Sequence, residues 1–152
     1  MKRICTFMLS ALALPLSLSA QTTTPPTGYK MVWSDEFNGT SLDTKVWNIE
    51  ENGNGGGNQE LQYYRKENVS VANGNLVLTA RRENYNNKQF TSGRINSRDK
   101  AYFKHGIIQA RIKFPKTANG VWPAYWMMGN DYGKLGWPRC GEIDIVETGN
   151  AE

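Results

Sequence analysis

The sequence predicts an all-β domain, built as a sandwich or barrel of short strands. Strand-like runs are separated by turns rich in glycine and asparagine. No stretch shows the sustained 3.6-residue apolar period of an amphipathic helix. With 152 residues, 39% of them hydrophobic and 21% charged, the chain has the size and composition of one ordinary globular domain.

The N-terminal residues resemble a secretory signal peptide. Lys2 and Arg3 make the first three residues positively charged, and residues 4–18 are apolar but too few to span a membrane. Ser19 and Ala20 are small residues, as a cleavage site needs. The alternative is a buried N-terminal helix. We therefore expect residues 1–20 to be cleaved, residues 21–28 to form a Thr/Pro-rich linker, and residues 29–152 to form the domain of a secreted protein, either extracellular or periplasmic.

Within that domain, the clearest element is a hairpin at residues 68–82. Two β-branched or aliphatic runs flank Asn73-Gly74, and this dipeptide supplies the positive φ that a tight hairpin turn needs. Similar short runs at residues 29–37, 60–65 and 141–148 predict further strands.

Residues 102–114 predict a half-buried strand, because Ile108, Ala110, Ile112 and Phe114 alternate with polar residues. The Gly-rich residues 51–60 lack the Gly-Lys-Ser/Thr ending of a phosphate-binding loop. We expect a surface loop there.

Charge and histidine content exclude several classes of protein. The formal charge is +4, from 18 basic and 14 acidic residues, which is too small and too mixed for a nucleic-acid binder. His105 is the single histidine, so a zinc cluster or a histidine-dependent triad is not expected.

The chemistry of the chain is concentrated in residues 141–147, Gly-Glu-Ile-Asp-Ile-Val-Glu. Side chains alternate faces along a strand, so Glu142 and Asp144 share a face and Glu147 has the opposite parity. One β-bulge across Ile145-Val146 would bring Glu147 to the same face, and bulges often re-aim side chains beside active sites.

A row of carboxylates on an apolar strand is costly unless it faces a cleft or binds a cation. The row suits retaining glycoside hydrolysis, which uses two carboxyl groups about 5–5.5 Å apart as nucleophile and proton donor. Asp144, between the two glutamates, could hydrogen-bond the nucleophile. The alternatives are a cation site and a solvated edge strand that resists aggregation.

Three tryptophans precede the carboxylates: Trp122, Trp126 and Trp137. Indole rings offer flat apolar surface that matches the C–H faces of sugar rings. The alternative is a role in the core, because Trp122 and Trp126 alternate with Ala124 and Met128 on one strand face.

From about Tyr29 onward, the chain resembles glycoside hydrolase family 16, and within it the bacterial endo-β-1,3-glucanases (laminarinases). Residues 142–147 match the family's Glu-x-Asp-x-x-Glu signature in its bulged form. Trp-Pro-Ala-x-Trp at residues 122–126 and Trp-Pro-x-x-Gly-Glu at residues 137–142 accompany it in order. Residues 58–62 carry an Asn-x-Glu-Leu-Gln stretch that also resembles the family.

The resemblance implies a jelly-roll sandwich whose concave sheet forms an open sugar cleft. It implies that Glu142 is the nucleophile, Asp144 the assisting carboxylate and Glu147 the acid/base. It also implies that the substrate is bound by Trp122, Trp126, Trp137, Asn58 and Arg94. No cofactor is required for catalysis, and a structural calcium ion is possible near Glu36 and the carbonyl of Gly74.

The activity implied is hydrolysis of internal β-1,3 bonds in a β-glucan with retention of configuration, by a protein that is monomeric at full length. The alternatives are a marine galactan hydrolase (agarase or carrageenase type) and a non-catalytic β-glucan-binding module. Sandwiches of this kind often have about 200–250 residues. We therefore expect the chain to be the N-terminal part of the catalytic domain, with an incomplete jelly roll and no activity by itself.

Overall fold

The computed structural model describes residues 24–116 and 120–149. These residues form strands with little helix, as the sequence predicts. In chain order the elements are β1 (Asn48–Ile49), β2 (Gln62–Tyr64), the 3-10 turn η1 (Lys66–Asn68), β3 (Val69–Ala72), β4 (Asn75–Leu78), β5 (Phe90–Ser92), β6 (Ile95–Asn96), β7 (Ala124–Met128), α1 (Tyr132–Leu135) and β8 (Glu142–Glu147).

The predicted signal peptide, residues 1–20, lies outside the described residues, as do residues 21–23 of the predicted linker. The domain boundaries therefore stay predictions. In the part of the chain that is described, no helix has the length and apolar character needed to cross a membrane.

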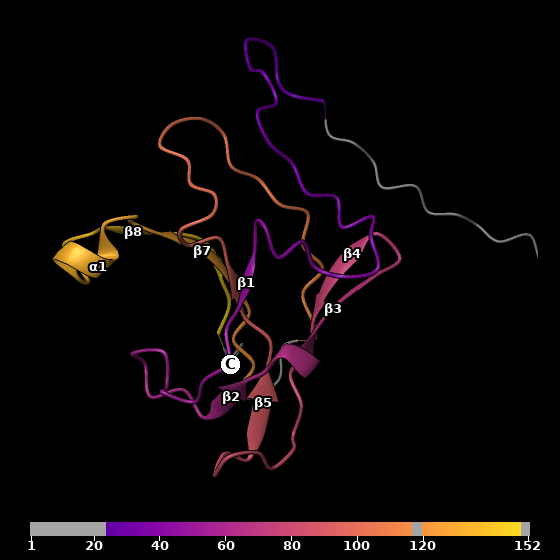
Figure 1. The fold of residues 1–152 in the computed structure, drawn as a ribbon, viewed down its shortest axis with the longest axis vertical. Coiled ribbons are helices and arrows are strands. Elements are labelled where there is room, and N and C mark those ends of the chain that lie inside the picture. Colours follow the sequence, from indigo (N-terminus) through magenta and orange to yellow (C-terminus); the bar gives the residue numbers. More distant parts are fainter. Residues whose placement is uncertain (1–23, 117–119, 150–152) are drawn as a thin grey trace, which may run out of the picture.

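The strands pair two by two. β1–β6, β3–β4 and β7–β8 are antiparallel, whereas β2–β5 is parallel. Single bridges, Asn52 with Tyr64 and Arg81 with Thr91, extend the pairing around β2 and β5. In Figure 1, β7 and β8 lie side by side on the left with α1 at their outer end, while the β3–β4 hairpin lies on the right and β2 and β5 at the bottom.

The predicted hairpin at residues 68–82 is confirmed. β3 and β4 pair from Val69 with Leu78 to Ala72 with Asn75. The two turn residues have positive φ, 53° at Asn73 and 69° at Gly74. These angles match the hairpin turn whose twist fits the flanking strands.

Two other strand predictions were wrong. Residues 29–37 and 102–114 contain no strand in the structure. Alternation of apolar and polar residues indicates that a segment, if extended, has one apolar and one polar face. It does not supply the neighbouring backbone whose hydrogen bonds define a strand.

A polar cluster lies where η1, β4 and β5 meet. Asn68 and Thr91 are almost completely buried. The Asn68 amide donates to the Thr79 carbonyl (2.7 Å) and to the Thr91 hydroxyl (3.0 Å), and that hydroxyl donates to Glu83 (2.5 Å). Buried polar groups need such partners, so the cluster fixes these three elements to one another.

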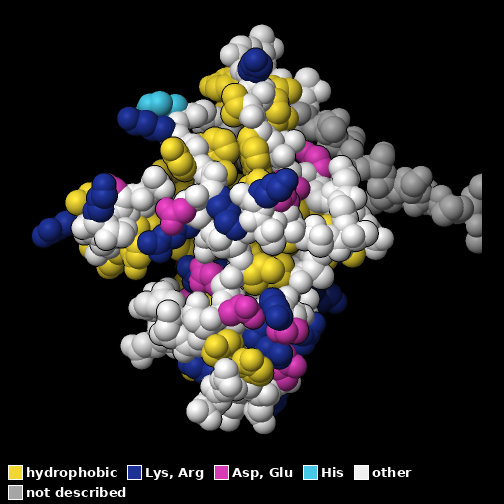
Figure 2. All heavy atoms as spheres, viewed as in Figure 1, with side chains coloured by type: hydrophobic (Ala, Val, Ile, Leu, Met, Phe, Trp, Pro, Cys, Tyr) yellow, Lys and Arg dark blue, Asp and Glu magenta, His cyan; other side chains and the backbone are white. Residues whose placement is uncertain are grey.

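Large hydrophobic side chains are exposed at many described positions, among them Trp122, Trp137, Ile143 and Ile145. Hydrophobic side chains reach the surface at several places on the face shown in Figure 2, next to acidic and basic side chains. Much of the apolar surface of the described residues is therefore not covered by other described residues.

Candidate active site

The carboxylate-bearing strand β8 contains the predicted β-bulge. Its residues pair with β7 as Glu142 with Met128, Asp144 with Trp126, and Glu147 with Ala124. Between Asp144 and Val146, β8 advances two residues while β7 advances one, from Trp126 to Tyr125. The extra residue is Ile145, so the bulge lies where the sequence predicted it.

The bulge places the three carboxylates on one face. Directly paired residues of an antiparallel ladder share a face, and the partners Ala124, Trp126 and Met128 alternate along β7. Glu142, Asp144 and Glu147 therefore all lie on the face of Trp126. All three are exposed, as a row of acidic groups must be when it is open to solvent or substrate.

Glycines hold both ends of the connection between β7 and β8. The Gly129 N–H donates to the Gly141 carbonyl (2.9 Å). A Cβ on Gly129 would lie 3.1 Å from the Cβ of Cys140 and even closer to its backbone. Gly141, just before β8, has a φ of 80°, a region that glycine adopts without strain. This turn chemistry fixes where β8 starts and so which of its residues face Trp126.

Arg94 joins Trp126 on this face. Its guanidinium carbon lies 5.0 Å from the centre of the Trp126 ring and 5.5 Å from that of the Tyr64 ring. Its Nε lies 3.1 Å from the Glu50 carboxylate, and its Nη1 lies 3.9 Å from Glu60. The structure therefore brings together two of the predicted substrate-binding residues, Trp126 and Arg94, beside the strand pair that carries the carboxylates.

Burial and neighbouring charges act on Arg94 and Tyr64. Burial disfavours the charge of the Arg94 guanidinium, but Glu50, Tyr64 and Glu60 together outweigh it and raise the pKa of Arg94. Burial, followed by the hydrogen bond to Glu60, raises the pKa of the Tyr64 hydroxyl. Arg94 is thus held as a cation, and Tyr64 as a neutral donor.

The other predicted substrate-binding residues lie apart. Trp122 comes two residues before β7, and Trp137 is 65% exposed in the connection between α1 and β8. Asn58 is exposed in the Gly-rich loop, where its backbone N–H donates to the Gly55 carbonyl (2.8 Å). Within the described residues, no hydrogen bond, ion pair or ring contact joins these three side chains to Trp126 or Arg94. Their roles stay predictions.

Sequence reasoning missed the glutamates and the tyrosine that surround Arg94. The Asn-x-Glu-Leu-Gln stretch includes Glu60, but the sequence predicts no role for its side chain. It also predicts no role for Glu50 or Tyr64. One available signal was the crowding of polar and aromatic residues at 58–64 beside a strand.

The predicted calcium donors, Glu36 and the Gly74 carbonyl, come from two separate parts of the chain. Among the described residues, no group of three or more His, Cys, Asp or Glu side chains could hold a metal ion. The side-chain oxygen of Asn38 lies 3.6 Å from the position of a Cβ on Gly74, so the segment after Glu36 lies beside the β3–β4 turn. Glu36 and the Gly74 carbonyl are hard oxygen donors, but calcium takes about six to eight. The calcium site therefore stays a prediction.

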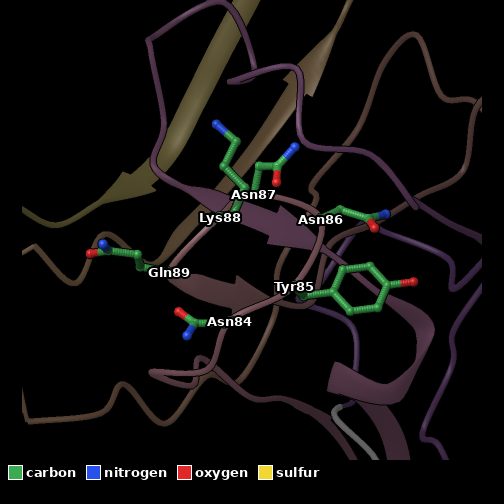
Figure 3. A pocket seen from close by; sticks show the side chains of 6 residues that line it. All are labelled: Asn84, Tyr85, Asn86, Asn87, Lys88 and Gln89. Carbon is green, nitrogen blue, oxygen red and sulfur yellow. The ribbon is translucent and has the colours of Figure 1, made fainter.

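A pocket on the surface lies elsewhere. It is lined by residues of the hairpin closed by mutual backbone hydrogen bonds of Tyr85 and Lys88 (both 2.9 Å). Figure 3 shows its side chains pointing in different directions, with Tyr85 aimed away from Lys88 and Gln89. No predicted catalytic or substrate-binding residue lines this pocket, and its polar groups do not converge as in a ligand site.

The strand pairs of an all-β domain, and a bulged strand with three carboxylates on the face of a tryptophan, are the arrangement that the resemblance to glycoside hydrolase family 16 implies. A model of the family described as "Beta-glucan synthesis-associated protein SKN1/KRE6/Sbg1" matches residues 9–142. The chain belongs to that family, and its resemblance to the family 16 laminarinases is confirmed by the relatives that follow.

The chain is 40% identical to a β-glucanase of Rhodothermus marinus, over 97% of this chain and 53% of that protein. Its structure is similar to the catalytic domain of a Thermotoga petrophila endo-1,3-β-glucanase (laminarinase), with a TM-score of 0.74 and 45% identity over 78% of this chain and 51% of that one. A Flavobacterium laminarinase gives a TM-score of 0.71 and 48% identity over 78% and 52% of the two chains. These likenesses confirm the jelly-roll prediction.

The chain spans only part of the curated relatives that it matches, between 18% and 53% of the first four. What those proteins act on is therefore a guide to the function of this chain and is developed as a proposal.

Proposed function

We propose that this protein hydrolyses internal β-1,3-glucosidic bonds of a β-glucan with retention of configuration. The observation that carries the proposal is the bulge at Ile145, which turns Glu142, Asp144 and Glu147 to one face of the β7–β8 pair. A retaining glycosidase needs a nucleophile and a proton donor close to the same glycosidic bond. Because both glutamates here come from β8, they can meet that need only if they share a face. The β-glucanases and laminarinases similar to this chain support the same activity.

The reaction has two displacements. In the first, the Glu142 carboxylate attacks the anomeric carbon, the glycosidic C–O bond breaks, and Glu147 gives its proton to the leaving oxygen. In the second, Glu147 takes a proton from water, and the water oxygen displaces Glu142 from the anomeric carbon. Asp144, between the two in register, assists as a hydrogen-bonding neighbour of the nucleophile.

Charge favours a neutral glucan over a sulfated galactan. The side chains on or beside this face include the three carboxylates of β8 and the two glutamates that pair with Arg94. While Glu147 holds the proton that it donates, the other four carboxylates still outnumber the single positive charge of Arg94, so a sulfate group would be repelled and would bind less tightly. Arg94 offers little compensation, because its charge is already balanced by Glu50 and Glu60.

The remaining parts of the proposal rest on the sequence. The leader-like residues 1–20 support secretion, to the cell exterior or the periplasm. The β-glucan chain is the expected partner, the full-length protein is expected to be a monomer, and catalysis needs no cofactor. Any calcium ion near Glu36 and Gly74 would act on stability alone.

The test replaces Glu142 by glutamine in the full-length protein. The amide keeps the shape of the side chain but cannot form the glycosyl ester, so turnover of laminarin is expected to fall more than about a hundredfold. Binding of laminarin, measured by calorimetry, is expected to persist. Glu83→Gln is the matched control, because it makes the same change in a glutamate that is ion-paired to Arg65 at 3.4 Å, in a part of the chain with no predicted catalytic residue.

The wild-type protein is assayed beside the variants on laminarin, mixed-linkage glucan, agarose and carrageenan. Turnover of Glu142→Gln above about one hundredth of wild type would exclude Glu142 as the nucleophile. Faster release of sugar from agarose or carrageenan than from laminarin would indicate a galactan hydrolase. Binding of laminarin without any hydrolysis by the wild type would indicate a binding module.

A further inference from the structure

Arg94 is held between two carboxylates on one side and an indole ring on another. Glu50 contacts its Nε and Glu60 faces its Nη1, while the flat guanidinium lies over the Trp126 ring. Arg94 and Glu50 are both about three-quarters buried, and Glu60 is the most buried of the three side chains, at 11% exposed. A cation this well enclosed has few alternative positions.

Both glutamates are themselves fixed by hydrogen bonds. Glu60 accepts from the Tyr64 hydroxyl (2.5 Å) and from the Gln62 amide (2.7 Å). Glu50 accepts from the Asn96 amide (2.9 Å), and its own backbone N–H donates to the Arg94 carbonyl (2.9 Å). Charge-assisted hydrogen bonds of this kind are the stronger ones in proteins.

The Gly-rich loop completes the enclosure of Glu60. A Cβ on Gly56 would lie 2.6 Å from the carboxyl carbon of Glu60, so the loop backbone is packed directly against that carboxylate. The Glu60 N–H also donates to the Gly55 carbonyl (3.0 Å). The segment that the sequence predicts as a surface loop therefore also packs against the Glu60 carboxylate and limits its movement.

We propose that Glu50 and Glu60 are positioning residues that act through Arg94 to hold the Trp126 ring beside the carboxylates of β8. This inference rests on the proposed function, in which Trp126 contacts the sugar chain. Trp126 pairs with Asp144 across the ladder, so a rotation of its ring moves the sugar-binding surface relative to all three carboxylates. Glu50 and Glu60 need not touch the substrate to affect how it binds.

Glu50 and Glu60 should affect the binding of glucan and not the cleavage of the glycosidic bond. The chemistry belongs to β8, whereas Glu50 and Glu60 control only the aromatic surface that Arg94 supports. Loss of either negative charge weakens the hold on the guanidinium, and with it the cation–π contact to Trp126. The affinity for a long glucan should fall, and the rate of bond cleavage in the bound complex should change little.

The experiment compares Glu50→Gln and Glu60→Gln with Glu83→Gln in the full-length protein. Glu83 is the matched control, since it pairs with Arg65, whose guanidinium lies 3.8 Å from the Tyr85 ring and not on Trp126. The first readout is the indole N–H resonance of Trp126, assigned by its loss in Trp126→Phe. We expect it to shift or broaden in Glu50→Gln and Glu60→Gln and to stay in place in Glu83→Gln.

The second readout is kinetic. We expect KM for laminarin to rise about three- to tenfold in Glu50→Gln and in Glu60→Gln, with kcat changed less than about twofold. In a Trp126→Ala background the same substitutions should have no further effect on KM, because the ring that they position is gone. Near-UV circular dichroism checks that each variant keeps its fold.

An unchanged Trp126 resonance in both glutamate variants would overturn the inference, and so would KM effects that persist in full without Trp126. Failure of the proposed function gives a different pattern, in which the wild type does not hydrolyse any glucan. The Trp126 resonance still tests the positioning roles in that case, because it does not depend on activity.

Discussion

Deletion of Ile145 tests the geometry of the carboxylate strand. Ile145 is the extra residue between Asp144, which pairs with Trp126, and Val146, which pairs with Tyr125. Without it, Val146 follows Asp144 directly, and each remaining residue of β8 can keep its partner on β7. The strand becomes regular, and the three carboxylates stay on one face.

The size of the effect follows from the register. Glu142 and Glu147 pair with Met128 and Ala124, four steps apart on β7, which is roughly 14 Å between Cα atoms at about 3.4 Å per residue. Removing Ile145 leaves that separation unchanged and alters the local bend and twist. A displacement of about 1 Å in an active site costs about a hundredfold in rate. We therefore expect the variant to keep at least about one hundredth of wild-type turnover.

Deletion of Ile143 is the matched control, because it removes the same type of residue from the same strand. It makes Glu142 and Asp144 adjacent, so their side chains point to opposite faces. The nucleophile is then separated from the other two carboxylates, and turnover should fall at least about a thousandfold. Release of reducing sugar from laminarin measures both variants, and near-UV circular dichroism checks their folds. Equal losses in two folded variants, or an active Ile143 deletion, would refute the assignment of faces.

Three further substitutions test the site and its support. Glu147→Ala should slow hydrolysis of laminarin far more than that of aryl glycosides with good leaving groups, and added azide should give a β-glycosyl azide; an α-azide would contradict the role of Glu147. Trp126→Ala should weaken binding of long glucans by about 1–3 kcal/mol in calorimetry; a lowered Tm with unchanged affinity would instead make Trp126 a core residue. Gly56→Ala should destabilise the protein by about 1–3 kcal/mol in chemical denaturation, because its Cβ would collide with Glu60 at a φ of 57°. Gly57→Ala, with a φ of 82° but open space around the Cβ, should cost less, and equal losses would show that strain alone is at work.

The features that the sequence predicted correctly depend on local chemistry. Asn73-Gly74 determines a turn by its own backbone preferences, and the positive φ angles of both residues agree. The bulge at Ile145 could be predicted because three carboxylates on one apolar strand are favourable only if they share an open face. Both the turn and the bulge are determined by a few residues that are neighbours in the sequence.

The strand predictions at residues 29–37 and 102–114 failed for a different reason. A strand exists only where a second backbone lies alongside, and β2 illustrates this. Its three residues pair in parallel with β5, which begins 26 positions after β2 ends. Nothing in the alternation of either segment specifies that partner. The pattern identifies extended chain, and the tertiary arrangement decides which extended segments become strands.

The environment of Arg94 could not be predicted for a related reason, and it bears on the chemistry. Glu50, Glu60 and Trp126 come from three separate parts of the chain, and an ion pair or a ring contact leaves no period in a sequence. A loosely held arginine near Trp126 would be attracted to the exposed acidic groups of β8, by up to about 1 kcal/mol for a solvent-exposed ion pair. Such a contact would occupy the nucleophile or its neighbour. Two glutamates behind Arg94 offer the same attraction from the other side, so the cation can support the indole ring while the carboxylates of β8 stay free for a substrate.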